Sequence, residues 1–229
     1  MTPASAKAGA SPSSDVCALA LRCDAERNRS AILAPAHEVF AEQGLEAPMA
    51  EVARRAGVGI ATLFRRFPAK DDLITATFAT TMGDHVRAID LAVADPDPWQ
   101  GFCGYLERVC AMQAIDRGFT DVLTRTFPDD TSFEADRDRA FRAFAGLIQR
   151  AKAAGRRRPD FVPQDLVMML MANAGVISAT SDAAPQTSPR LVAYLLQACS
   201  TECAQPLPPP PSPRSIVQAL RGLRQSSET

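Results

Sequence analysis

Long apolar runs are missing from this chain of 229 residues. No stretch approaches the ~20 apolar residues that a membrane-spanning helix needs, and residues 1–15 lack the apolar segment of a secretory signal peptide. The alternation of apolar and polar residues that marks a half-buried strand is also missing. These absences predict a cytoplasmic protein that is built from helices and makes no membrane contact.

Residues suited to catalysis or metal binding are few. The two histidines, His37 and His85, lie far apart in the sequence and have no nucleophile context. A glycine-rich phosphate loop and a carboxylate pair of marked spacing are missing too, which argues against an enzyme. The six cysteines show no paired CxxC spacing. We therefore expect reduced structural thiols, with no metal and no cofactor; a metal site or a thiol switch is the alternative.

The net charge of −1 conceals an uneven distribution. Residues 22–70 contain eight Lys or Arg against six Asp or Glu, and residues 139–158 contain seven against none. Residues 71–138, in contrast, contain five against fourteen. A DNA-binding protein with such an acidic body would turn its basic end toward the duplex.

Residues 51–70 predict two short helices joined by a glycine turn. Gly57 suits the left-handed conformation that closes the first helix. Leu63 and Phe67 share the inward face of the second helix, which Pro68 ends. Helices of this length joined by such a turn are the helix-turn-helix pattern. Five basic residues and no acidic one between positions 54 and 70 suit a polyphosphate partner, although a plain helical hairpin with solvated arginines explains the same pattern.

The same segment resembles the DNA-reading part of tetracycline-repressor-type (TetR-family) regulators. Their usual pattern contains Ala-Gly-Val, then Thr-Leu-Tyr, two polar residues, Phe or Val, a short turn and Lys. The matching residues here are Ala56-Gly57-Val58, Thr62-Leu63-Phe64, Arg65-Arg66-Phe67 and Lys70. Glu38-Val39-Phe40-Ala41-Glu42-Gln43-Gly44 upstream is also similar, so the resemblance spans about residues 25–80.

The resemblance implies an all-α fold, with an N-terminal three-helix helix-turn-helix head and a C-terminal helical body for ligand binding and dimerisation. Pro35 predicts a kink in the first helix, and the spacing of apolar residues predicts the bounds of the helices. The expected parts are a disordered arm (1–21), the head (22–80, motif about 48–67), the body (81–205) and a proline-rich spacer and tail (206–229). The expected helices span residues 24–43, 70–93, 99–116, 119–127, 132–154, 163–180 and 189–203.

Roles at the DNA follow from the resemblance position by position. The side chains expected to approach bases or the adjoining backbone are those of Ile60, Ala61, Thr62 and Arg65. Phe64 replaces the usual Tyr, so it keeps only an apolar contact, for example with a thymine methyl. Arg66 and Lys70 would hold phosphates, as would the N-terminus of the helix after Lys70. Arg27 and Arg29 are either phosphate contacts or solvated side chains.

A small-molecule pocket between the body helices is implied as well. Its apolar candidates are Phe102, Tyr105, Met112, Phe144 and Met171, for which a plain core is the competing interpretation. The last two body helices are expected to pair with their symmetry mates. The faces expected there carry Leu166, Leu170 and Met171 on one helix and Leu191, Leu195 and Cys199 on the other.

These features together predict a homodimeric repressor of a pseudo-palindromic DNA operator, released by an unknown small-molecule effector. Its two recognition helices would enter major grooves with half-site centres about 34–36 Å apart. One alternative is a helical protein-interaction module with a degenerate head, suggested by Ile60, Ala61 and Phe64. A DNA-processing enzyme is another, but its nucleophile and clustered carboxylates are not evident in the sequence.

Overall fold

The structure is a computed structural model that describes residues 30–124, 127, 130–180, 183–201, 205–212 and 214–215. Its first helix covers residues 30–43. The helices that follow are α2 (Met49–Arg55), α3 (Ile60–Arg66), α4 (Lys70–Ala94), α5 (Pro98–Ile115), α6 (Arg117–Thr124), α7 (Thr131–Ala153), α8 (Pro163–Thr180) and α9 (Thr187–Ala198). No strand occurs among the described residues, and the expected all-α class is confirmed.

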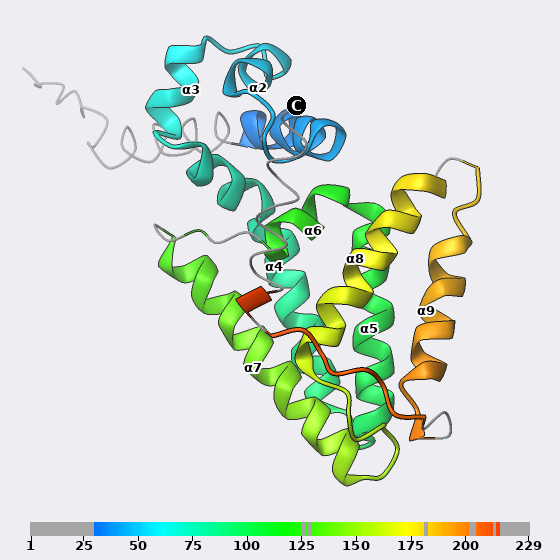
Figure 1. Ribbon diagram of the computed structural model, residues 1–229. Coiled ribbons are helices and arrows are strands. Elements are labelled where there is room, and N and C mark those ends of the chain that lie inside the picture. Colours follow the sequence, from blue (N-terminus) through cyan, green and yellow to red (C-terminus); the bar gives the residue numbers. More distant parts are fainter. Residues whose placement is uncertain are drawn as a thin grey trace, which may run out of the picture.

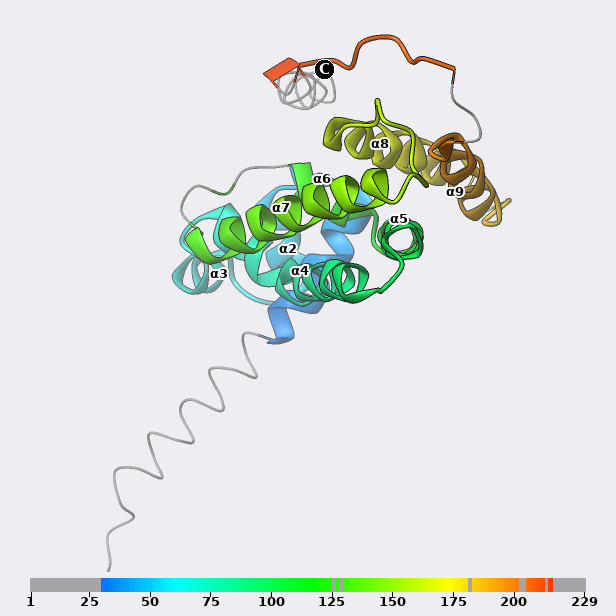
Figure 2. The ribbon, with the colours of Figure 1, turned by 90° about the horizontal axis from the view of Figure 1, so that it is seen from below.

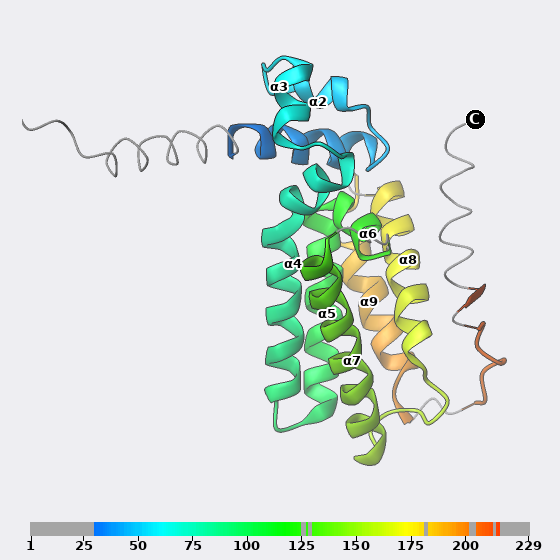
Figure 3. The ribbon, with the colours of Figure 1, turned by 90° about the vertical axis from the view of Figure 1, so that its left-hand side faces the viewer.

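A small head sits above a body of longer helices (Figure 1). The first helix, α2 and α3 make the head, and α4 runs from the head down the whole body. In the body α4 packs chiefly against α5 and α7, and the long helices run side by side in roughly one direction (Figure 3). Seen from below, α8 and α9 form a pair on the far side of α5 from α4 (Figure 2).

Two apolar cores share α4. The head core joins the first helix, α2 and α3 to the upper half of α4, and it includes Leu63, Phe67 and Phe78. The body core joins the lower half of α4 to α5, α7, α8 and α9. Four residues beyond α4 also belong to the head core, namely Phe119 and Val122 of α6, Phe127, and Phe133 of α7. The head is therefore packed onto the body through α4, α6 and the start of α7.

Close packing of α6 against the head depends on Gly118. A Cβ atom at this position would lie 2.8 Å from Cζ of Phe78 and 3.5 Å from the carbonyl oxygen of Phe40. Glycine is thus the residue that lets α6 approach these two head residues. Just before α6, a carboxylate oxygen of Asp116 lies 2.8 Å from Nε2 of His37 in the first helix.

Two helices end earlier than expected. α6 ends at Thr124, and Phe127 lies beyond it as a buried member of the head core. α9 ends at Ala198 instead of residue 203, because the chain turns there and pairs with the segment that follows α7. The amide of Arg158 donates to the carbonyl of Cys199 at 3.1 Å. Such backbone bonds replace the ones that a longer helix would have made.

Several expectations fall wholly or partly outside the described residues. These are the arm over residues 1–21, Arg27 and Arg29, and the part of the tail that follows residue 215.

The first helix is unbroken from residue 30 to residue 43, with Pro35 inside it. Among the described helices, none has both the length and the apolar content to cross a bilayer.

Candidate DNA-binding surface and ligand cavity

The turn between α2 and α3 is closed by two backbone hydrogen bonds. The amide of Val58 donates to the carbonyl of Ala53 at 3.0 Å, and the amide of Gly57 donates to that of Arg54 at 3.2 Å. This pair of bonds is the Schellman motif, which needs a left-handed residue, and Gly57 has a φ of 66°. Glycine adopts this φ without the steric cost that a Cβ atom brings. The turn therefore fixes the angle between the two helices.

α3 has one buried face and one exposed face. Leu63 is completely buried in the head core, as is nearly all of Phe67 just after the helix. All the remaining residues of α3 are exposed: Ile60, Ala61, Thr62, Phe64, Arg65 and Arg66. Two of them are large and apolar, since Ile60 keeps 43% and Phe64 45% of its surface in solvent. Six of the seven residues of α3 are thus exposed to solvent.

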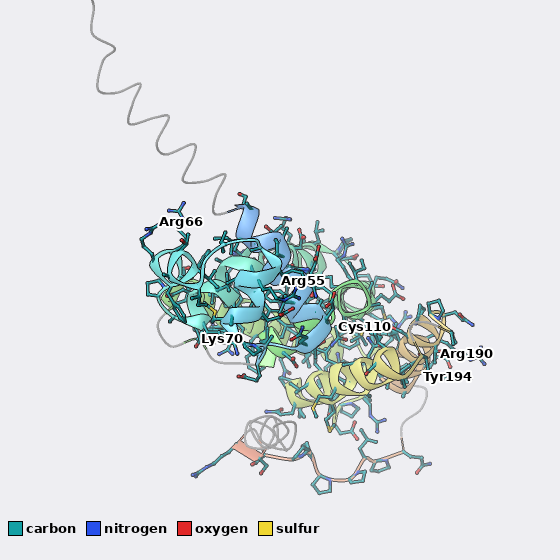
Figure 4. The ribbon with its side chains drawn as sticks, turned by 90° about the horizontal axis from the view of Figure 1, so that it is seen from above. Arg55, Arg66, Lys70, Cys110, Arg190 and Tyr194 are labelled. Carbon is teal, nitrogen blue, oxygen red and sulfur yellow. The ribbon has the colours of Figure 1, made fainter. Side chains whose placement is uncertain are left out.

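The arginines of α2 are bound to acidic residues of the head. Arg54 donates to both carboxylate oxygens of Glu51, at 2.6 and 2.8 Å. Arg55 donates to Glu42 of the first helix at 2.6 and 3.1 Å, and its hydrogen bonds lower the pKa of that carboxyl. Figure 4 shows Arg66 projecting outward from the head, away from Arg55. The positive charges on α3 itself are those of the exposed Arg65 and Arg66.

The start of α4 lies next to the same surface. Lys70 is half-buried, and its Nζ lies 3.4 Å from a carboxylate oxygen of Glu46. A carboxylate oxygen of Asp72 accepts from the amide of Ala69 at 2.8 Å and so caps the helix. Asp71 and Asp72 both lie in the first turn. Their carboxylates already interact favourably with the positive N-terminal end of the helix dipole, the position at which a phosphate was expected.

A cavity of about 100 Å³ lies in the body among α4, α5, α6, α7 and α8. Its walls are mostly apolar and include the rings of Tyr105, Phe144 and Phe141. Two buried polar side chains line it, His85 of α4 and Gln113 of α5, with 5% and 1% of their surface exposed. Burial lowers the pKa of His85 to about 4 and raises the pKa of Tyr105, so both side chains are uncharged near pH 7.

Of the five expected pocket residues, the cavity brings three together: Tyr105, Phe144 and Met171. Phe102 is buried in the body core, where its ring stacks on those of Trp99 and Phe144. Met112 packs against the head core. Sequence reasoning missed His85, and a lone histidine in an amphipathic helix carries no local signal of a cavity.

A buried polar network lies beside the cavity. Gln113 of α5 donates to the hydroxyl of Thr120 in α6 at 2.9 Å and accepts from Asn173 of α8 at the same distance. Ser188 of α9 then donates to Asn173 at 2.8 Å. Four helices are joined in this way, and Gln113 and Thr120 also line the cavity. Buried polar groups are costly unless they are bonded, so the network fixes how these helices pack.

The faces expected to dimerise lie partly inside the protomer. Leu166 and Leu170 of α8 and Cys199 after α9 are buried in the body core, so they are not available to a second chain. The expectation was wrong for these residues because both helices turn these side chains toward α5. The exposed apolar side chains on this side are Met168 and Tyr194. Tyr194 and Arg190 project outward from α9 (Figure 4), and their side chains are joined by a 3.0 Å hydrogen bond.

Fold and surface together define a helix-turn-helix DNA-binding protein with a separate helical body. The sequence profile of the bacterial regulatory proteins of the tetR family matches residues 32–77. A second profile, the C-terminal domain of SbtR-like transcriptional regulators, matches residues 97–198. Together the two profiles cover more than half of the chain. The protein belongs to the TetR family of transcriptional regulators, which are DNA-binding proteins and not enzymes.

Similar proteins agree with this assignment. A helix-turn-helix-type transcriptional regulator of Staphylococcus aureus strain USA300 is 43% identical over 54 residues, which cover 23% of this chain and 29% of that protein. The chain thus matches less than a third of the length of this relative.

Solved structures share the fold at low identity. PfmR from Thermus thermophilus has a TM-score of 0.58 and 18% identity, over 73% of this chain and 95% of that one. The ketosteroid regulator KstR2 of Mycobacterium tuberculosis has a TM-score of 0.56 and 15% identity, over 76% and 95%. AmtR of Mycobacterium smegmatis has a TM-score of 0.53 and 19% identity, over 72% and 83%.

Proposed function

We propose that this regulator is a homodimeric repressor that leaves its operator when a small molecule binds in the body. The proposed head covers residues 22–80 and the proposed body residues 81–205. One observation carries the proposal. α6 has one face in the head core, through Phe119 and Val122, and another at the cavity, through Thr120 and Leu123. A molecule that moves α6 from within the cavity therefore also moves residues that position the head.

Release from DNA needs only a shift between two head positions. An effector changes this equilibrium by as much as it prefers one position over the other. In the proposed mechanism the bound molecule favours a dimer whose two heads have the wrong separation for successive major grooves. The close contact of Gly118 with Phe78 makes α6 and the head move together.

At the operator, α3 occupies the major groove with its exposed face. Ile60, Ala61, Thr62 and Arg65 face the bases or the adjoining backbone, and Phe64 packs on an apolar base edge. Arg66 and Lys70 contact phosphates from the end of α3 and the start of α4. To contact a phosphate, Nζ of Lys70 has to leave the carboxylate of Glu46. This exchange is feasible because ion pairs at the protein surface contribute little to stability.

Dimerisation is proposed through the outer faces of α8 and α9. Tyr194 keeps 56% of its surface in solvent in the protomer, and the exposed positions of α8 near Met168 include small residues such as Ala172 and Gly175. Small residues let two helices approach closely. In sedimentation experiments Tyr194→Arg should give monomers and weaken operator binding. Leu91→Arg places the same charge on an exposed leucine of α4 and should leave a dimer; monomers from both variants, or from neither, would contradict this face.

The function is tested by selecting bound sequences from random DNA. A pseudo-palindromic site should emerge and, placed across a promoter, should lower reporter output when the protein is present. Higher output would identify an activator. With the selected site, Arg66→Ala and Lys70→Ala should weaken binding to all sequences about equally and reduce the salt slope by about one unit each. Arg87→Ala, an exposed arginine of the body, should leave the slope unchanged.

A further inference from the structure

His85, which lines the cavity, has one ring nitrogen without a hydrogen-bond partner among the described residues. Nδ1 of His85 is buried and has no hydrogen-bond partner within the described part of the chain. The other ring nitrogen, Nε2, lies 3.5 Å from the hydroxyl of Tyr105, at the limit of a hydrogen bond. A buried polar atom without a partner costs stability, which a ligand group bonded to it would recover.

The charges around the cavity are unsuited to an anionic ligand. His85 and Tyr105 are uncharged, for the reason given above. The charged side chain in the lining is that of Arg137, which is in contact with the carboxylate of Glu134. A carboxylate or phosphate in the cavity would lose its hydration without gaining an unpaired cation, and such burial is costly.

Size and shape restrict the ligand further. An apolar cavity of 150 Å³ binds benzene, and this one is smaller, at about 100 Å³. A ligand larger than a single small ring would therefore exceed it. The rings of Tyr105 and Phe144 lie 5.1 Å apart and tilted by 37°, which gives a flat apolar molecule two aromatic walls.

We propose that the cavity binds an uncharged, ring-sized apolar molecule with a single hydroxyl or carbonyl group, which hydrogen-bonds to Nδ1 of His85. A hydroxyl suits either tautomer of the imidazole because it both donates and accepts. A carbonyl suits the tautomer in which Nδ1 carries the proton. The inference rests on the proposed function, since it names the class of effector for the same site.

Phenol, toluene and benzoate are suitable probes because they share a ring and differ in one group. Calorimetry at pH 7 should detect phenol and toluene but not benzoate. The ratio of the toluene to the phenol dissociation constant should fall about tenfold in His85→Leu, as expected for the loss of one hydrogen bond. His85→Asn keeps an uncharged hydrogen-bonding group and should retain most of the ratio. Val167→Phe, in the cavity wall, should weaken both probes equally.

Nitrogen-15 NMR of labelled histidine tests the contact without any substitution. The chain contains two histidines, so His37→Gln identifies the signals of His85. Phenol should shift the Nδ1 signal of His85 far more than toluene does, with His37 as an internal reference. Equal effects of the two probes, tight binding of benzoate or no binding of phenol would each overturn the inference.

Operator binding separates this inference from the proposed function. If phenol binds at His85 and the selected operator stays bound, the ligand class stands and release by an effector fails. If benzoate or another anion releases the operator through the cavity, release by an effector stands and the ligand class fails.

Discussion

The head and the body place their polar groups differently. Residues 30–70, which hold the three short helices of the head, include no buried polar or charged side chain, and the ion pairs of Arg54 and Arg55 lie at the surface. The body buries His85, Gln113, Asn173 and others, several of them bonded across three or four helices. An apolar core with local turns is enough to hold a small three-helix head. In the body, the buried polar bonds between helices specify one arrangement of these helices, because satisfied polar networks rigidify a core.

The largest expected effect comes from breaking the head core. Leu63→Ala should lower the free energy of unfolding by about 2–5 kcal/mol, because it leaves a cavity under the recognition helix. Phe64→Ala, the next residue on the exposed face, should change it by no more than about 0.5 kcal/mol. Denaturant unfolding measures both. A loss below about 1 kcal/mol for Leu63→Ala would mean that the head core adapts to the change.

A pH titration tests the buried polar side of the comparison. Because the pKa of His85 is lowered from 6.5 to about 4, the unfolded chain binds a proton in this range and the folded chain does not. The free energy of unfolding should therefore fall as the pH drops from about 6.5 to about 4, by roughly 3 kcal/mol from this group. Groups close to His85 are the rings of Tyr105 and Phe119, with Arg137 in the same cavity wall.

The control for this titration is His85→Leu, which removes the titrating group. Its unfolding free energy should depend less on pH over the same range, and the difference between the two curves isolates His85. Parallel curves for the two proteins would show that His85 does not titrate as its burial requires.

Adjacent arginines of the body provide a third test. The guanidinium of Arg157 lies 3.7 Å and 3.1 Å from the ring centroids of Phe102 and Phe161, and its nitrogens have no hydrogen-bond partner among the described residues. Burial lowers its pKa to about 9. Arg158 instead bonds to Asp160 and to the carbonyls of Ala198 and Gln205.

Opposite outcomes are expected for the two substitutions. Arg157→Met should raise the free energy of unfolding by about 1–3 kcal/mol, because a hydrophobic side chain replaces an unpaired buried charge. Arg158→Met should lower it, because carbonyl and carboxylate groups lose their donor. Thermal unfolding distinguishes them. Destabilisation by Arg157→Met would mean that the two aromatic contacts outweigh the cost of burying the charge.

The last test measures DNA selectivity instead of stability and concerns the exposed face of α3. Arg65 is one turn from Thr62 on this face, and its guanidinium fork matches O6 and N7 of guanine. Arg65→Ala should remove about 1–3 kcal/mol of discrimination at one G·C pair per half-site and leave the flanking preferences unchanged. Repeating the selection of bound DNA with this variant measures it. An unchanged base profile would make Arg65 a phosphate contact.

The sequence alone determined the head. Its turn, its inward residues Leu63 and Phe67 and its exposed residues follow from spacings of three or four positions and from one glycine. Such signals are local, because a helix places these neighbours on one face whatever surrounds it. The approximate helix bounds follow for the same reason, whereas the family came from the resemblance of about residues 25–80 to TetR-type regulators. The exposure of the expected DNA contacts on α3 agrees with this pattern, whereas Lys70 is half-buried. The roles of all these residues at the operator stay predictions.

The arrangement of the body helices and the residues that border the cavity follow only from the tertiary structure. The bond between Gln113 and Asn173 joins residues 60 positions apart, and that between His37 and Asp116 spans 79. Apolar spacing shows that Leu166 and Leu170 share a face but not whether that face meets α5 or a second chain. Likewise Phe102 and Phe144 have the same local pattern, yet only Phe144 borders the cavity. Side chains far apart in the sequence become neighbours only when whole helices pack, and that packing gives His85 its cavity.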